Sequence, residues 1–91
     1  MRVKFFATYR DITQRMEDYV TVEPDIWALL LRLSDQYGDV FRDMVFSQEG
    51  TEISKEAIIL VNGRDICHLL GKNTPLDKAD TVSIFPAVAG G

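Results

Sequence analysis

The 91-residue chain has the length of one small domain, and its formal net charge at neutral pH is −4. Hydrophobic residues make up 46% of the chain and charged residues 26%, which are ordinary values for a globular protein. The ten Lys and Arg residues are scattered, so neither nucleic acid nor an anionic membrane is an expected partner. No apolar run approaches the roughly 18 residues of a membrane span, and we expect a cytoplasmic protein. One cysteine excludes an internal disulfide and multi-cysteine metal or iron–sulfur sites, and one histidine argues against His-rich metal sites and most histidine-dependent triads.

The N-terminal quarter of the chain predicts two strands joined by a polar connection. Residues 2–9 alternate in the manner of a strand. One face of this strand carries Val3, Phe5 and Ala7. Phe6 therefore falls on the opposite face. Residues 10–18 are polar and read as a loop, and the β-branched content of residues 19–23 favours a second strand.

A change of period after Pro24 predicts the main helix. Apolar residues recur at the spacing of one helical stripe, at Ile26, Leu29, Leu30, Leu33 and Tyr37. Asp25 is suited to cap the N-terminus of this helix, and Gly38 is suited to end it. Residues 41–46 predict a further helical turn that covers the edge of the core.

The C-terminal half predicts more strands. Residues 47–56 are polar and read as a surface loop, to which we assign no function. Residues 57–61 form a continuous apolar run, typical of a strand buried on both faces. Asn62-Gly63 is a strong hairpin-turn signal, because both central positions of such a turn need positive φ. A short strand at residues 65–67 is expected to pair back.

Residues 81–85 predict the last strand, which completes the order β-β-α-β-(β)-β. One long helix covers one face of a mixed sheet in this order, which indicates an α+β two-layer domain. We therefore expect a four- to five-stranded mixed sheet packed on one main helix.

Three stretches carry a family resemblance: residues 3–10 at the start, the turn at residues 61–63, and the close from residue 76 to the Gly-Gly at 90–91. Together they resemble the ubiquitin-like β-grasp sulfur carriers of the MoaD/ThiS family, and they are most similar to the small subunit of molybdopterin synthase. The resemblance implies a single β-grasp domain over residues 1–91, with a flexible tail at 86–91.

The resemblance also implies a chemical cycle at the C-terminus. An activating enzyme similar to those that activate ubiquitin adenylates the Gly91 carboxylate, using ATP and Mg²⁺ that it binds itself. A sulfur donor then forms a thiocarboxylate, which the large subunit of molybdopterin synthase or another acceptor consumes. The carrier binds no cofactor stably and contributes no catalytic side chain. Activation is needed because a carboxylate is a poor electrophile at neutral pH. Gly90 and Gly91 lack Cβ and so can pass a narrow channel.

The residues before the diglycine indicate how the tail leaves the body. Pro86 cannot donate to a ladder, so it suits the end of the last strand. Val88 and Ala89 add apolar contacts without bulk. Ala87 stands where the molybdopterin branch usually has a second proline, which leaves carriers for thiamine or cysteine synthesis open. A ubiquitin-like modifier joined through Gly91 to lysines also stays open, because both uses begin with the same acyl-adenylate.

Strand parity places two aromatic rings on the uncovered face of the sheet. If Val3 and Val82 face the helix, Phe6 and Phe85 face outward. We expect these rings to lie together and dock a partner, with Pro86 and the tail beside them. The alternative is that residues 41–46 cover one of the two rings.

Cys67 and His68 are neighbours in sequence, which suggests a nucleophile pair at first sight. Adjacent side chains face each other neither on a helix nor on a strand. We therefore expect Cys67 to be a small core residue and His68 to lie at the surface.

Overall fold

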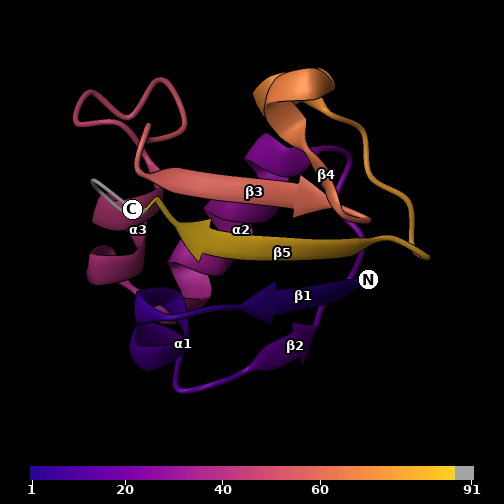
Figure 1. Ribbon diagram of the computed structural model, residues 1–91. Coiled ribbons are helices and arrows are strands. Elements are labelled where there is room, and N and C mark those ends of the chain that lie inside the picture. The colour runs from indigo at the N-terminus through magenta and orange to yellow at the C-terminus, as the bar shows by residue number, and fades with distance from the viewer. Residues whose placement is uncertain (88–91) are drawn as a thin grey trace.

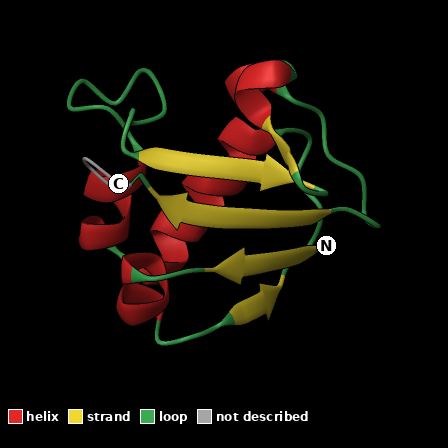
Figure 2. Ribbon diagram, viewed as in Figure 1, coloured by secondary structure: helices red, strands yellow, loops and turns green. Residues whose placement is uncertain are grey.

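A computed structural model describes residues 1–87, in which helices cover one side of a single five-stranded sheet (Figure 1). Figure 2 shows the same division, with the strands in front of the longest helix. The elements in chain order are β1 (Arg2–Phe5), α1 (Thr8–Thr13), β2 (Glu17–Tyr19), α2 (Ile26–Tyr37), α3 (Asp39–Val45), β3 (Ala57–Val61), β4 (Arg64–Asp65), the 3₁₀ turns η1 (Ile66–His68) and η2 (Gly71–Asn73), and β5 (Thr81–Pro86). The predicted α+β fold is confirmed.

The sheet has the strand order β2-β1-β5-β3-β4. Strands β1 and β5 are parallel neighbours, whereas all other neighbouring strands are antiparallel. The last strand therefore lies in the middle of the sheet, and it delivers the C-terminal segment from there.

Helix α2 begins and ends where the sequence predicts. The Asp25 carboxylate accepts the backbone N–H of Ala28 at 2.9 Å, which satisfies one of the unpaired donors of the first turn. Gly38 follows the helix with a φ of +97°, a region that favours glycine, and separates α2 from α3. Short α3 confirms the helical turn predicted at residues 41–46.

The core lies between α2 and the covered face of the sheet. Its fully buried members include Val3, Phe5, Leu29, Leu30, Leu33, Ile59, Val82 and Ile84. The Phe5 ring makes edge contacts with Tyr37 at 5.5 Å and Phe41 at 6.3 Å between centroids. Burial of each large apolar side chain stabilises the fold by about 1.5–3 kcal/mol.

The N-terminal region corrects the prediction. β1 ends at Phe5, and α1 replaces the end of the predicted strand and the first part of the predicted loop. The second strand lies at residues 17–19 instead of 19–23. Ala7 has a φ of +53°, so the chain turns out of the sheet after Phe6. Tyr9 is then fully buried, and its hydroxyl donates to the Met44 carbonyl at 3.2 Å. The burial and hydrogen bond of Tyr9 stabilise a helix here, although the local alternation of side chains favours a strand.

The hairpin after β3 confirms the turn prediction. Asn62 and Gly63 have φ values of +52° and +84°. The returning strand covers residues 64–65 instead of 65–67, because η1 begins at Ile66. No helix among residues 1–87 is long and apolar enough to cross a membrane.

Candidate functional site

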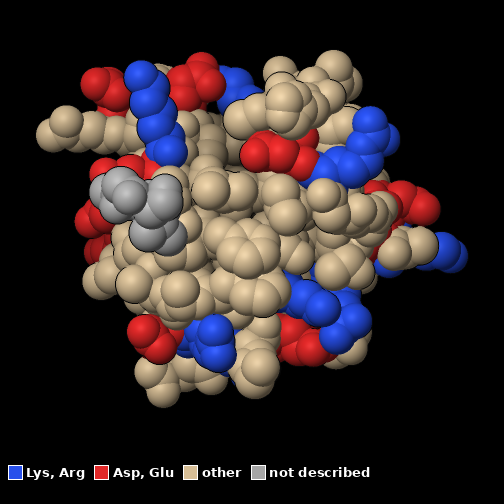
Figure 3. Space-filling model, in the orientation of Figure 1, with Lys and Arg blue, Asp and Glu red and all other residues tan. Residues whose placement is uncertain are grey.

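The face of the sheet without helices carries an apolar row across three strands. The register pairs Ile58 with Phe85 and Phe5 with Ile84, and Phe6 directly follows Phe5. Phe6, Phe85 and Ile58 therefore stand side by side, and we call them the apolar row. Figure 3 shows this face, where uncharged side chains fill the centre and charged residues surround them.

The two aromatic rings of the row are stacked. The centroids of Phe6 and Phe85 lie 4.1 Å apart with 8° between the ring planes, and both residues are half-buried. The prediction that the rings lie together is confirmed. Residues 41–46 do not cover them, since Phe41 packs against Phe5 on the opposite side of the sheet. Docking of a partner on this pair stays a prediction.

Backbone pairing fixes the position of both rings. The Phe6 N–H donates to the Ile84 carbonyl at 3.1 Å, which continues the β1–β5 ladder by one residue. The positive φ of Ala7 then directs the chain away from the face. Since β1 and β5 are parallel, both rings lie at the end of the sheet where β5 finishes.

An ion pair marks the β1–β2 side of the same face. The Arg2 guanidinium donates to both Glu17 oxygens, with Nε–Oε2 and Nη2–Oε1 distances of 2.9 Å. The hydrogen bond from Arg2 holds the pKa of Glu17 below its usual value. An apolar centre with a polar rim is the anatomy of a protein-binding surface.

Sequence reasoning missed Ile58 as a member of this face. The apolar run of β3 predicts burial on both sides, but burial alternates, with Ile59 at 1% exposure and Ile58 at 36%. The prediction of a doubly buried strand is therefore wrong, because helices cover only one face of the sheet. The antiparallel pairing of β3 with β5, which follows from the fold order, is the signal that places Ile58 beside Phe85.

The C-terminal segment leaves the sheet beside the start of β3. Pro86 is the last residue of β5 and pairs with Ala57. The Ala87 N–H donates to the Glu56 carbonyl at 2.7 Å. The first two residues of the predicted tail are therefore held by the sheet. The other predicted site residues, Val88, Ala89, Gly90 and Gly91, lie outside the described residues.

Cys67 and His68 follow one another in η1. Both are exposed, so the prediction that Cys67 belongs to the core is wrong: η1 buries Ile66 and turns the next side chain outward. The Asp65 carboxylate raises the pKa of the Cys67 thiol through a hydrogen bond and its charge, which disfavours the reactive thiolate. Among residues 1–87, no cluster of His, Cys, Asp and Glu is suited to hold a metal ion.

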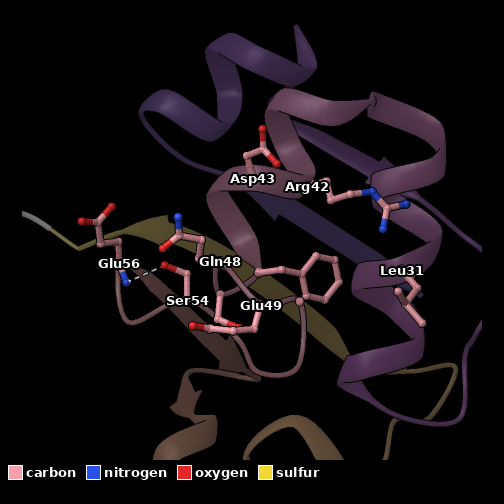
Figure 4. Close-up of a pocket in the computed structure, with 10 residues that line it drawn as sticks. Leu31, Arg42, Asp43, Gln48, Glu49, Ser54 and Glu56 are labelled. Atoms are coloured by element: carbon pink, nitrogen blue, oxygen red, sulfur yellow. Dashed lines mark hydrogen bonds between the residues drawn. The ribbon is translucent and has the colours of Figure 1, made fainter.

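A cavity of about 630 Å³ lies between the helices and the segment at residues 47–56 (Figure 4). Leu31 and Arg42 line it from the helices, while Ser54 and Glu56 line it from the segment. Arg42 pairs with Asp35 at 3.2 Å. Within the described part of the chain no buried side-chain polar atom lacks a partner. The cavity shares no residue with the apolar row.

Comparisons with known proteins agree with this geometry. The ThiS family model matches residues 3–91. The chain belongs to the ThiS family. A relative of this ThiS-family chain is small archaeal modifier protein 3 of Haloferax volcanii, which is 34% identical across all of this chain and 98% of its own length.

Two solved structures share the fold of this chain. Small archaeal modifier protein 1 of Methanosarcina acetivorans is 31% identical, with a TM-score of 0.83 over 99% of this chain and 94% of that one. A chain of the Amycolatopsis orientalis BexX/CysO complex shares the fold at 20% identity, with a TM-score of 0.77 over 99% and 98% of the two chains. This ThiS-family chain is thus a small ubiquitin-like β-grasp protein of the carrier and modifier type.

Proposed function

We propose that the protein is a ubiquitin-like modifier whose Gly91 carboxylate is adenylated and then joined to lysine side chains of other proteins. The observation that supports this most is the 34% identity to small archaeal modifier protein 3 over the whole chain. The molybdopterin branch expected from the sequence has weaker support, because the relatives above 30% identity with a functional name are modifiers.

The proposed chemistry takes place at the end of the tail. A Gly91 carboxylate oxygen attacks the α-phosphorus of ATP on an activating enzyme of the ubiquitin-activating type, and pyrophosphate leaves. A lysine amine then attacks the acyl carbon, AMP leaves, and the nitrogen loses a proton to give an amide. The ATP and its Mg²⁺ belong to the activating enzyme. The apolar row docks that enzyme, since stacked aromatic rings at the centre of a polar rim are typical anchors.

A second candidate function is sulfur transfer, which membership of the ThiS family favours. A hydrosulfide ion attacks the acyl carbon of the same acyl-adenylate, AMP leaves, and loss of the remaining S–H proton gives a thiocarboxylate. The acceptor is then the large subunit of molybdopterin synthase, or an enzyme of thiamine or cysteine synthesis.

The test compares the full chain with a variant that lacks Gly91, each carrying an N-terminal tag, in cells of the source organism. We expect higher-mass conjugates with the full chain and none with the deletion. Isolation of the tagged protein followed by intact mass measurement detects the exchange of oxygen for sulfur.

Phe85→Ala is the companion variant, because it alters docking and keeps the carboxylate. It should lower the yield of conjugates without changing their attachment site. Absence of conjugates together with a thiocarboxylate would favour the carrier. Absence of both, in cells where the adenylating enzyme is expressed, would overturn the proposal.

A further inference from the structure

The last hydrogen bond of the sheet ties the segment at residues 47–56 to the root of the tail. Pro86 pairs with Ala57 but has no N–H of its own to donate. The next residue, Ala87, supplies the donor, and its N–H lies 2.7 Å from the Glu56 carbonyl oxygen. The ladder between β5 and β3 thus extends one residue beyond the strand, although Ala87 itself is exposed.

The acceptor of this bond is held by Ser54. The Ser54 hydroxyl accepts the Glu56 N–H at 3.1 Å, a contact drawn in Figure 4, and the Ser54 carbonyl accepts the Ala57 N–H at 3.1 Å. The Ser54 N–H in turn donates to the Val45 carbonyl at 2.9 Å, at the end of α3. A turn anchored on a helix therefore fixes the carbonyl to which the tail root is bound.

The bond lies close to the Gly91 carboxylate that the proposed function uses. Residues 88–91 connect Ala87 to that carboxylate. At about 3.3–3.6 Å per residue, four residues span at most about 14 Å. A release of the Ala87 N–H would add one residue, or roughly 3.5 Å, to that reach.

We propose that the hydrogen bond from Ala87 to Glu56 sets the reach of the tail, and that Ser54 and Ala87 are positioning residues for the reaction at Gly91. This inference rests on the proposed function. Its partner is an adenylating enzyme whose reactive centre lies within about 14 Å of Ala87 when the apolar row is docked. A proline in place of Ala87 has no donor, so the tail leaves the sheet one residue earlier.

The hydrogen bond itself is tested by amide hydrogen exchange on the full chain. We expect the Ala87 amide to be protected in the wild type and to exchange at least tenfold faster in Ser54→Ala. Ser47→Ala is the matched control, because its hydroxyl also accepts a backbone N–H at 3.1 Å, from Glu52, but does not contact Glu56. Exchange of Ala87 at the unprotected rate in the wild type would overturn the inference.

The positioning role is tested by a cycle of tail variants. The measured quantity is kcat/KM for adenylation by the organism's own activating enzyme, followed as pyrophosphate release. Deletion of Ala89 shortens the tail, and we expect a loss of tenfold or more in the wild-type background. In Ala87→Pro the same deletion should cost threefold or less, because the released residue restores the reach. Ala87→Ser keeps the N–H and should behave like the wild type.

The outcomes separate this inference from the proposed function. Equal costs of the deletion in the wild-type and Ala87→Pro backgrounds would overturn the positioning role while adenylation stands. A wild-type chain that its enzyme does not adenylate would overturn the proposed function and the positioning role together, even with a protected Ala87 amide. Thermal unfolding of each variant shows whether a loss of activity comes from a loss of fold.

Discussion

The two faces of the sheet are built from alternate residues of the same strands, yet they meet different surroundings. On the covered face Ile84 is fully buried beneath α2, whereas the next residue, Phe85, is half-exposed on the other face. Phe5 and Phe6 show the same division one strand away. One face therefore carries the packing that stabilises the fold, and the other carries large apolar side chains that the isolated domain leaves partly in water.

The aromatic contacts of the two faces differ in the same way. Phe5 meets Tyr37 and Phe41 edge-on within a closed core. Phe6 stacks on Phe85 alone, in a row open to solvent. A stacked pair adds about 0.5–1.5 kcal/mol beyond area burial, so the exposed rings hold each other in place without a helix above them. Because the two rings are already in place, little conformational entropy is lost in ordering them when a partner binds.

Among the variants considered, Ile84→Ala on the covered face should lower the free energy of unfolding most. Because Ile84 is fully buried among packed neighbours, truncation leaves a cavity and should lower the free energy of unfolding by about 2–5 kcal/mol. Urea unfolding followed by circular dichroism measures the change. A loss below about 1 kcal/mol would mean that this face does not carry the stability of the domain.

Phe85→Ala breaks the uncovered face. We expect affinity for the adenylating enzyme to fall about 10- to 100-fold, since aromatic anchors at the centre of an interface dominate binding. The free energy of unfolding should fall by only about 1–2 kcal/mol, because the side chain is already partly in water and one stacked partner is lost. Calorimetry measures the affinity, and urea unfolding measures the stability.

Tyr19→Ala is the control for Phe85→Ala. Tyr19 pairs with Arg2 and so lies on the same face, at the outer edge of the sheet, where it is 71% exposed. Its loss should leave affinity within about threefold of the wild type, as expected for a residue outside the interface centre. Equal losses at Tyr19 and Phe85 would show that the apolar row is not the anchor.

The sequence predicts the covered face better than the edges of the sheet. The stripe of α2, its Asp25 cap and the Asn62-Gly63 turn all depend on local spacing, so they are predicted correctly. The helix α1 is missed because its cause is not local: Tyr9 reaches the core and binds the Met44 carbonyl 35 residues away.

The sequence predicts those parts of the candidate site that depend only on the alternation of side chains along a strand. Parity places Phe6 and Phe85 on one face, and the parallel pairing of β1 and β5 brings them together. The third member, Ile58, depends on the order of strands in the sheet, which the apolar run of β3 does not reveal. The bond between Ala87 and Glu56 depends on the turn at Ser54, for which the sequence has no spacing signal.

Two neighbouring carboxylates of β2, Glu17 and Asp18, lie on opposite faces of the sheet. Asp18 pairs in register with Val3 and belongs to the covered side, where its carboxylate accepts the Tyr37 hydroxyl at 2.7 Å and the Gln36 amide at 3.0 Å. Burial raises the pKa of Tyr37 to about 12, and the hydrogen bond to Asp18 adds to the rise. Glu17, the next residue back, lies on the uncovered side and binds Arg2. The two carboxylates thus differ in what they connect: Asp18 joins the sheet to α2, whereas Glu17 joins two strands.

Asp18→Asn is the smallest of the three effects and the one that depends on pH. Burial would raise the pKa of the Asp18 carboxyl, but the hydrogen bonds from Tyr37 and Gln36 outweigh it and lower the pKa below its ordinary value. Because this pKa is lowered in the folded protein, ionised Asp18 stabilises the fold at any pH above the pKa that its carboxyl has in the unfolded chain. This contribution is lost as the pH falls through the pKa of the carboxyl in the folded protein. At pH 7 the substitution should therefore cost about 1–2 kcal/mol, and the difference from the wild type should shrink as the medium is acidified. Urea unfolding at neutral and acidic pH measures it.

Glu17→Gln is the control, because it removes the same charge from the neighbouring position on the other face. The ion pair of Glu17 with Arg2 is partly open to water, so solvent screens it and its loss should change the unfolding midpoint less than Asp18→Asn does. If Glu17→Gln costs more than Asp18→Asn at pH 7, the covered face does not govern the acid sensitivity of the fold.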